Sequence, residues 1–293
     1  MGNKVGGKTV DRIKVAAIQF DSKSGDKERN LLNAIKLIEQ SAEHHVRIAA
    51  IPDWFYTGYP ITRENVTKWA EPVPGPATNA LAETARKHGM YIVGGSIIET
   101  DGGSLYCTCP ILDPNGELLG KYRKVNFWML PPVDEAGSGL MPGTDYPVFE
   151  IDGTRIGVML QIDIDFPETA RVLALRGAEI LFWLTAVQYP WMDVCRALAR
   201  AYAFVNCAYF IIANRTGVFD RYTYYGESAI LNPFGDTIAS AGQSYGALFP
   251  EGIALASLDL ETLHRTREML KPFERRKPET YTEIVSRVQR SHS

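Results

Sequence analysis

Apolar runs and amphipathic stretches alternate along the first half of the chain. Between two apolar runs, Leu32, Ile35 and Ile38 recur at the spacing of one helix face. A second amphipathic stretch ends at Gly89, and glycine is typical of helix ends. The pattern predicts helices over 28–45 and 79–89, strands over 13–20, 47–55, 91–99, 104–113 and 118–125, and a turn over 113–116.

The second half repeats this order of elements. One amphipathic stretch begins with Pro167 and ends at Gly177, the proline-first and glycine-last arrangement of a helix. Apolar runs lie on both sides of it. The pattern predicts helices over 167–177 and 191–206, strands over 155–162, 178–184, 208–214 and 252–260, and a hairpin over 227–241.

The repeated strand–helix–strand order predicts an α/β fold. Each half has too few helices to cover both faces of its own sheet, so the two sheets must cover each other. We therefore expect a four-layer α-β-β-α sandwich of two stacked mixed sheets with outer helices, in one domain over 12–270. Residues 1–11 are rich in glycine and lysine and are expected to be loose. The charged tail 271–293 either wraps around a partner subunit or forms a solvated helix.

Composition narrows the class of protein. The chain has 293 residues, 45% of them hydrophobic, and a net charge of -3, which permits a large core and gives no sign of binding to nucleic acid or to an anionic membrane. No apolar run reaches the ~18 residues of a membrane span, and the start lacks the apolar core of a signal peptide. We therefore expect a cytoplasmic protein.

Cysteine and histidine usage bears on the chemistry. Four cysteines in a chain of this length are typical of reduced thiols. None of the five histidines has a metal-ligand spacing or lies beside a candidate nucleophile. We expect no metal, no cofactor and no Ser/His/Asp triad. Cys107, Cys109, Cys195 and Cys207 are interpreted as packing thiols.

One strand end draws attention as a site. The stretch RIGVMLQIDIDFPE, residues 155–168, is expected to run from a buried strand into a helix that opens at Pro167. Many α/β enzymes carry a nucleophile at such a junction. Here the junction holds Gln161, whose amide is a poor nucleophile.

Six segments resemble the nitrilase superfamily of carbon–nitrogen hydrolases. They are AAIPDWFYTGYP, GKYRKVNF, GVMLQIDIDFPE, RGAEILFW, AYFIIANRTG and GESAILNPFGD, in the family's order and spacing over residues 13–270. The carboxyl end is similar to the N-carbamoyl-amino-acid amidohydrolase branch. The resemblance implies an αββα fold and a homodimer. It also implies attack on a nitrile or amide carbon by a cysteine thiolate, with a glutamate base, an oxyanion-stabilising lysine and a second, positioning glutamate.

The chain keeps only part of that catalytic set. Lys124 matches the family's lysine, and Glu135 is the best match to the second glutamate. Asp53 replaces the base glutamate and has a shorter stem, which moves the carboxylate by about 1 Å. Gln161 stands where the family has cysteine, so it cannot form a thioester. Asn126 stands where the family commonly has a histidine. Val205, which precedes Asn206, stands where the family has a glutamate.

Several roles have two interpretations at this stage. Asp53 and Lys124 are either a functional pair or a structural ion pair. Gln161 either donates to a substrate carbonyl or fills the space of the lost thiol. Asp163 either contacts the substrate or, with Asp165, caps the helix near Pro167. Aromatic and polar neighbours either line a substrate pocket or pack the core: Tyr56, Tyr59, Asn126, Trp128 and the cluster over 222–228.

Three functions are compatible with these residues, each with a small molecule as ligand or substrate. The first is a repurposed enzyme that performs acid–base chemistry on an amide-like, carbamoyl-like or nitrogen-rich metabolite, because Asp53, Asn126 and Gln161 keep polar character. The second is a non-catalytic member that binds a small molecule or a partner subunit. The third is a slow amidohydrolase in which Asp53 activates water.

Overall fold

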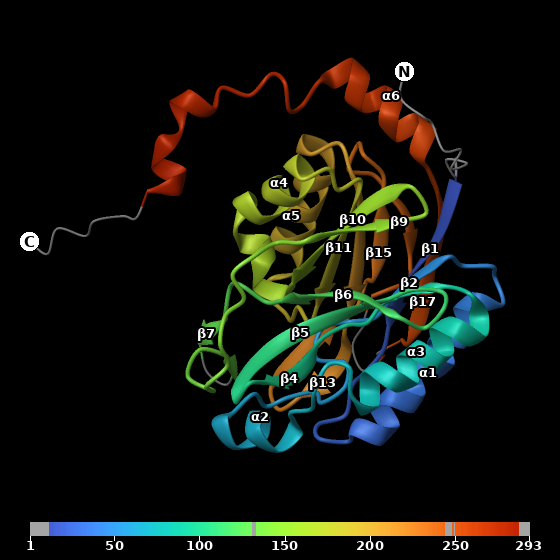
Figure 1. Ribbon diagram of the computed structural model, residues 1–293, viewed down its shortest axis with the longest axis vertical. Coiled ribbons are helices and arrows are strands. Elements are labelled where there is room, and N and C mark those ends of the chain that lie inside the picture. Colours follow the sequence, from blue (N-terminus) through green and yellow to red (C-terminus); the bar gives the residue numbers. More distant parts are fainter. Residues whose placement is uncertain (1–11, 131–132, 244–247, 249, 287–293) are drawn as a thin grey trace, which may run out of the picture.

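Two β-sheets stacked face to face form the centre of the computed structural model, and helices cover their outer faces (Figure 1). The structure describes residues 12–130, 133–243, 248 and 250–286, so the predicted loose segment 1–11 lies outside them. The expected four-layer sandwich is confirmed. None of the helices in these described ranges is both long and apolar enough to cross a bilayer.

The first sheet has the order β17-β1-β2-β3-β5-β4, and β6 pairs with β5. Strands β1, β2 and β3 are parallel, and the other pairs are antiparallel. The strands are β1 (Arg12–Gln19), β2 (Ile48–Ala50), β3 (Tyr91–Val93), β4 (Ile97–Asp101), β5 (Ser104–Leu112), β6 (Leu118–Arg123) and β17 (Gly252–Asp259).

The second sheet has the order β16-β15-β12-β11-β10-β9, with a parallel centre of β10, β11 and β12. Its strands are β9 (Val148–Ile151), β10 (Thr154–Leu160), β11 (Ile180–Thr185), β12 (Tyr209–Asn214), β15 (Ala229–Leu231) and β16 (Thr237–Ser240). Two small ribbons lie apart from both sheets: β7 (Met129–Leu130) with β8 (Val133–Asp134), and β13 (Thr216–Phe219) with β14 (Tyr222–Tyr225).

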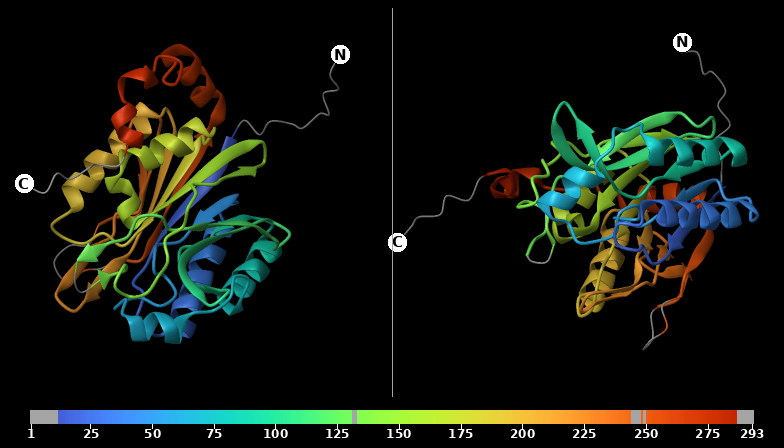
Figure 2. Two further views of the ribbon diagram at one scale, coloured as in Figure 1. Left: turned by 60° about the vertical axis from the view of Figure 1, so that its left-hand side comes forward. Right: turned by 90° about the horizontal axis from the view of Figure 1, so that it is seen from below.

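Helices pack on the outer face of each sheet through their apolar sides (Figures 1 and 2). Helices α1 (Lys27–Ala42) and α3 (Pro76–His88) share a buried cluster with the first sheet. Helices α4 (Pro167–Leu175) and α5 (Met192–Val205) share another with the second sheet. The remaining helices are α2 (Arg63–Trp69), α6 (Leu260–Leu270) and the short 3-10 turns η1 (Gln161–Asp165), η2 (Pro278–Thr280) and η3 (Thr282–Val285).

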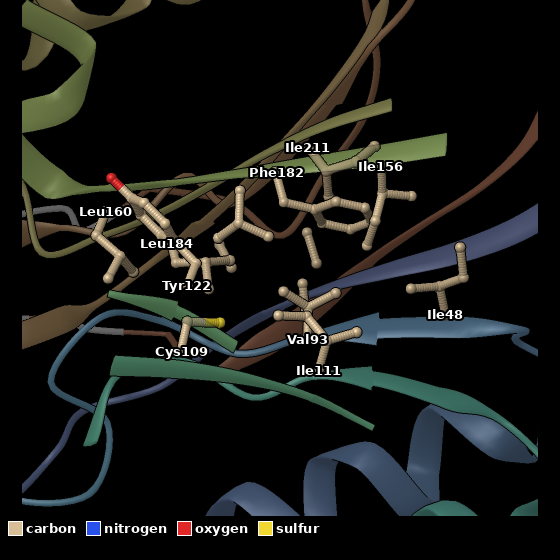
Figure 3. Close-up of a cluster of buried hydrophobic side chains, with 14 of the residues drawn as sticks. Ile48, Val93, Cys109, Ile111, Tyr122, Ile156, Leu160, Phe182, Leu184 and Ile211 are labelled. Carbon is tan, nitrogen blue, oxygen red and sulfur yellow. The ribbon is translucent and has the colours of Figure 1, made fainter. Parts of the chain in front are cut away.

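The layer between the sheets is the main apolar core (Figure 3). Ile48, Val93 and Ile111 of the first sheet lie opposite side chains of the second sheet, among them Ile156 and Phe182. All five are fully buried. Because burial of such a side chain stabilises a fold by about 1.5–3 kcal/mol, this layer holds the sheets at a fixed separation.

The strands that lead to the site end earlier than the apolar pattern predicts. The run over 47–55 leaves the sheet after Ala50, since Trp54 adopts a left-handed backbone with φ +52°. The run over 91–99 divides into β3 and β4 at Gly94 and Gly95. A Cβ on Gly95 would lie 2.5 Å from the carbonyl oxygen of Pro52, so this break lets two loops pass closely. Helix α2 and the ribbon β13–β14 were not predicted.

The tail extends away from the body after α6 (Figures 1 and 2). The Phe273 ring, at its start, lies 5.8 Å from the Arg171 guanidinium and 5.4 Å from that of Arg267. The part beyond residue 286 is outside the described chain. The homodimer, and a tail that wraps around a partner, stay predictions.

Alanine at Gly95 is expected to destabilise the chain more than alanine at Gly102. Both glycines have positive φ, +62° and +57°, but nothing lies within 4 Å of a Cβ on Gly102. Left-handed backbone costs an alanine about 1–2 kcal/mol. The contact with Pro52 adds roughly 1–3 kcal/mol of overpacking to Gly95→Ala alone. Urea denaturation of both variants measures the difference, and equal losses would contradict the close approach.

Candidate active site

Four polar side chains meet where strands of the two sheets end. Asp53 follows β2, Lys124 follows β6, and Gln161 follows β10. Glu135 follows the short strand β8. The ends of neighbouring strands in α/β sheets are where ligand sites form, because loops there bring distant residues together. The predicted catalytic residues are thus drawn from both sheets.

Lys124 and Glu135 form a fully buried ion pair. Lys124 Nζ donates to Glu135 Oε1 at 2.6 Å and to Oε2 at 2.8 Å. The Trp128 backbone N–H donates to Glu135 Oε2 at 2.8 Å. Burial alone lowers the pKa of Lys124, but the charges of Glu135 and Asp53 raise it above its ordinary value. Lys124 is therefore a permanent cation.

Gln161 completes the contacts of this cation. Lys124 Nζ also donates to Gln161 Oε1 at 3.2 Å. The Gln161 backbone has φ +39°, a strained region for a residue other than glycine. Its carbonyl oxygen accepts a hydrogen bond from Trp183 Nε1 at 2.8 Å, which holds the turn in place. The Gln161 side chain is thus aimed at Lys124.

Asp53 is buried without a hydrogen bond of its own. It is fully buried, and neither carboxylate oxygen has a hydrogen-bond partner among the described residues. Burial raises the pKa of Asp53 from 3.8 to about 7, against the opposing charge of Lys124. Ser96 and the Trp54 amide lie near enough to lower that pKa, but the Trp54 N–H is spent on Ser96 Oγ at 2.7 Å.

The predicted direct pair between Asp53 and Lys124 is wrong. Lys124 pairs with Glu135, which takes two of its N–H bonds. Asp53 acts on Lys124 only through its charge. The apolar neighbours of Asp53 in the sequence correctly indicated its burial. They did not indicate that Lys124 would pair with Glu135, which lies in a loop that matches the family loosely.

Asp163 is a structural clamp. Its Oδ2 accepts from the Tyr122 hydroxyl at 2.6 Å and the Leu160 N–H at 2.8 Å, and its Oδ1 accepts from Asn126 Nδ2 at 2.9 Å. These bonds close the turn η1 around Gln161. The expectation that Asp163 and Asp165 cap α4 is wrong. The N-cap residue of α4 is Phe166, and no side-chain hydrogen bond caps the helix there.

A cavity of about 510 Å³ opens beside Gln161. Trp128 lines it, as predicted for a substrate contact, together with Tyr222 and Tyr224 of the aromatic cluster. Tyr59 stacks on Tyr224 with ring centroids 5.7 Å apart and does not itself line the cavity. Asn126 Nδ2 is spent on Asp163 and on the Tyr146 hydroxyl, away from the lining.

Sequence reasoning missed the loop that forms the opposite wall. Trp183 near the end of β11, and Ala186, Val187, Gln188 and Trp191 beyond it, all line the cavity. The signal was available, because β11 is parallel to β10 and its carboxyl end must lie at the same edge. Tyr56 lies elsewhere, on the outer side of the first sheet with α1 and α3.

Thiols lie nearby but are not activated. Cys107 is fully buried, and its carbonyl oxygen accepts from the Lys124 N–H at 2.8 Å. Burial raises the pKa of Cys107 well above its ordinary value, and the Asp53 charge adds to this. Cys195 lines the cavity, with a pKa that burial raises to about 12. Both are therefore protonated near neutral pH, and Cys107 does not line the cavity. The proximity of Cys107 to the charged pair was not foreseen.

The described residues contain no cluster of three or more His, Cys, Asp or Glu side chains arranged to hold a metal ion. The site contains the Lys124 ammonium, the Gln161 amide and the Asp53 carboxyl group, whose pKa is about 7. Such a set can polarise a carbonyl oxygen and move a proton.

Replacing Asp53 with asparagine is expected to remove a pH-dependent loss of stability. The folded chain retains the Asp53 proton up to pH about 7, whereas the unfolded chain loses it near 3.8. Stability therefore falls as pH rises through this interval. Relative to the wild type, Asp53→Asn should gain stability between pH 5 and pH 8.5, by something of the order of 1–3 kcal/mol.

Urea denaturation at the two pH values tests this, with Asp236→Asn as control. Asp236 is exposed in the turn between β15 and β16. An Asp53→Asn variant that gains nothing at pH 8.5 would contradict the raised pKa.

Comparison with known proteins agrees with this geometry. A sequence model of the family described as carbon-nitrogen hydrolase matches residues 14–268. Omega-amidase NIT2 of Xenopus tropicalis is 32% identical over 286 residues, 92% of this chain and 97% of that protein. Omega-amidase NIT2 of Homo sapiens is 30% identical, with coverages of 93% and 97%.

Among solved structures, Saccharomyces cerevisiae Nit3, a member of branch 10 of the nitrilase superfamily, matches with a TM-score of 0.80. It is 26% identical, and the match covers 91% of this chain and 97% of Nit3. The resemblance to the N-carbamoyl-amino-acid branch stays a prediction. The chain belongs to the carbon–nitrogen hydrolase family of the nitrilase superfamily.

Proposed function

We propose that this chain is an enzyme that performs acid–base chemistry, without a thioester intermediate, on a small metabolite with an amide, carbamoyl or other nitrogen-rich group. The Asp53 carboxyl carries this proposal. It is fully buried, has no hydrogen-bond partner among the described residues, and has a pKa of about 7. A group whose pKa lies near the working pH can accept a proton and return it.

Lys124 supplies the electrophile. Its bonds to both oxygens of Glu135 and to Gln161 Oε1 use the three N–H donors of an ammonium. A substrate carbonyl oxygen that replaces Gln161 Oε1 faces Lys124 Nζ and is polarised by it. Gln161 lines the cavity and also contacts the buried cation, so its side chain connects the open space to Lys124.

The proposed step needs no covalent bond to the protein. Asp53 takes a proton from the substrate while Lys124 stabilises the negative charge on the carbonyl oxygen. The protonated Asp53 then returns the proton to a different atom of the substrate, which completes a proton transfer, cyclisation or elimination. Because Asp53 does not line the cavity, the substrate reaches it past the side chain of Gln161.

A second candidate is binding without turnover. The Lys124–Gln161 bond favours it, because the chain's own amide already occupies the oxygen site of the cation. A third candidate is slow amide hydrolysis by direct attack of water, with Asp53 as base. The omega-amidase names of the relatives favour it. Water is a weaker nucleophile than a thiolate, so this reaction would be slow.

Asp53→Asn is expected to lower kcat/KM by a factor of about 10²–10⁴, since it removes the proton acceptor. Wild-type activity should rise with pH through about 7, where Asp53 loses its proton. Incubation with simple amides, N-carbamoyl amino acids and nitriles, followed by product mass and ammonia release, measures the reaction. Asp236→Asn, in an exposed turn, should retain full activity.

The product separates the three candidates. A changed product that contains no added water supports acid–base chemistry. Ammonia release that Asp53→Asn abolishes supports hydrolysis by water. A ligand that raises the melting temperature and is recovered unchanged supports binding alone, and it contradicts the proposed enzyme.

Gln161→Cys is expected to create amidase activity with an acyl-enzyme intermediate. The new thiol would lie beside Lys124, within range of the Asp53 carboxyl that must take its proton. Ammonia release and the acyl adduct seen in the intact mass are the readouts. Gln161→Ala is the matched control, because it removes the amide without adding a thiol. Equal activity of the two variants would show that the base cannot serve a thiol at this position.

A further inference from the structure

Five of the fifteen described residues that line the cavity beside Gln161 are aromatic. Three tryptophans and two tyrosines line it: Trp128, Trp183, Trp191, Tyr222 and Tyr224. Trp191 is half exposed. Flat aromatic walls of this kind favour a planar ligand, because rings stack on rings over a large contact area.

Among the described residues, the side chains that line the cavity include an acidic group and no basic group. Asp165 is its single carboxylate, and within the described part of the chain the lining contains no lysine, arginine or histidine. Cations outside the lining contact its residues. Lys124, which contacts the lining, is paired with Glu135, and the exposed Arg221 donates to the Tyr222 hydroxyl at 3.2 Å. Partial burial raises the pKa of the Asp165 carboxyl, and no cation offsets this. The cavity therefore favours a positive group and opposes a carboxylate.

Arg215 is a buried cation outside the lining, and its pairing with Asp21 leaves the charge of the cavity unchanged. The Arg215 guanidinium lies 4.4 Å from the Tyr224 ring centroid, outside the lining. It donates to the Ser22 carbonyl oxygen at 2.7 Å and to Asp21 at 3.3 Å. Its charge is thus paired with Asp21, although its Nε and Nη1 have no partner among the described residues.

The spacing between the two polar ends of the cavity sets a length. Gln161 and Asp165 are the first and last residues of the turn η1. A 3-10 helix rises by about 2 Å per residue, so the two positions are about 8 Å apart along the turn. A benzene ring with an amide at one end and an aminomethyl group at the other spans a distance of this order.

We propose that the substrate of this chain has a planar aromatic body and a basic nitrogen, the amide end at Gln161 and the cation at Asp165. Trp191, Tyr222 and Asp165 are then specificity-determining residues, since aromatic faces and a carboxylate together attract a cation. This proposal rests on the proposed function in one respect only, the placement of the amide at Gln161.

Three probes of one shape test the proposal by calorimetric Kd at neutral pH and low salt. They are para-(aminomethyl)benzamide, para-(hydroxymethyl)benzamide and para-carboxybenzamide, which share the ring and the amide and carry para substituents of similar size and different charge. We expect the cationic probe to bind about tenfold more tightly than the neutral one, and the anionic probe more weakly than both. The non-aromatic analogue of the cationic probe, with a cyclohexane ring, should also bind more weakly than its parent.

Two variants assign the effect to residues. Asp165→Asn should remove the preference for the cationic probe and leave the Kd of the neutral probe unchanged. Trp191→Leu should weaken binding of the cationic and the neutral aromatic probe by a similar factor. Asp165 and Trp191 are exposed, so both variants are expected to fold, and a thermal melt checks this. Asp236→Asn is the control.

An anionic probe that binds as tightly as the cationic one overturns the proposal. So does a cationic preference that survives Asp165→Asn, or the absence of binding by all three probes at millimolar concentration. Charge-selective binding with no turnover of any amide would instead refute the proposed enzyme and leave this inference intact. Turnover that is indifferent to probe charge would refute the inference and leave the enzyme intact.

Discussion

The site depends on one buried ion pair, between Lys124 and Glu135. Both side chains have zero exposure, and burying either charge alone would cost several kcal/mol. Glu135 keeps Lys124 protonated inside the fold and takes two of its three donors. Because Glu135 is the ion-pair partner of Lys124, burial is the largest influence on the pKa of Asp53. The Glu135 charge adds to the rise, and the Lys124 charge, Ser96 and the Trp54 amide oppose it. A carboxyl that titrates near neutrality follows from the pairing of its neighbours.

Gln161 gives this arrangement its distinctive chemistry. Residue 161 is held beside Lys124 by its positive-φ backbone, by the hydrogen bond from Trp183 and by the hydrogen bonds of Asp163. These are the supports that an attacking group would need, and they surround an amide. The chain belongs to the carbon–nitrogen hydrolase family, and residue 161 is a glutamine, whose amide is a poor nucleophile. This contrast favours a reaction that relies on proton movement and a polarised oxygen.

Periodicity predicted the architecture because burial alone decides it. The run that became β10 is buried on both faces, and α1 buries one face, although Leu32 of its predicted stripe is 62% exposed. A pattern of apolar positions records such burial. Strand ends were predicted less well, since Trp54 and Gln161 leave the sheet through positive φ, which apolar character does not signal. Asp53, Lys124, Glu135 and Gln161 were found through motif order. The Lys124–Glu135 pairing and the Trp183–Trp191 wall were not, because both depend on which loops meet in space.

The two sheets contribute different members of the site. Lys124 extends from the first sheet and Gln161 from the second, and their contact of 3.2 Å bridges the gap between them. The thickness of the apolar layer that contains Ile111 and Phe182 thus sets the reach of the cation toward the cavity. A methylene gained or lost deep in that layer therefore changes the distance between Lys124 and Gln161. The distance between Lys124 and Gln161 is in that sense a property of the packing between the sheets, and residues far from the cavity can change it.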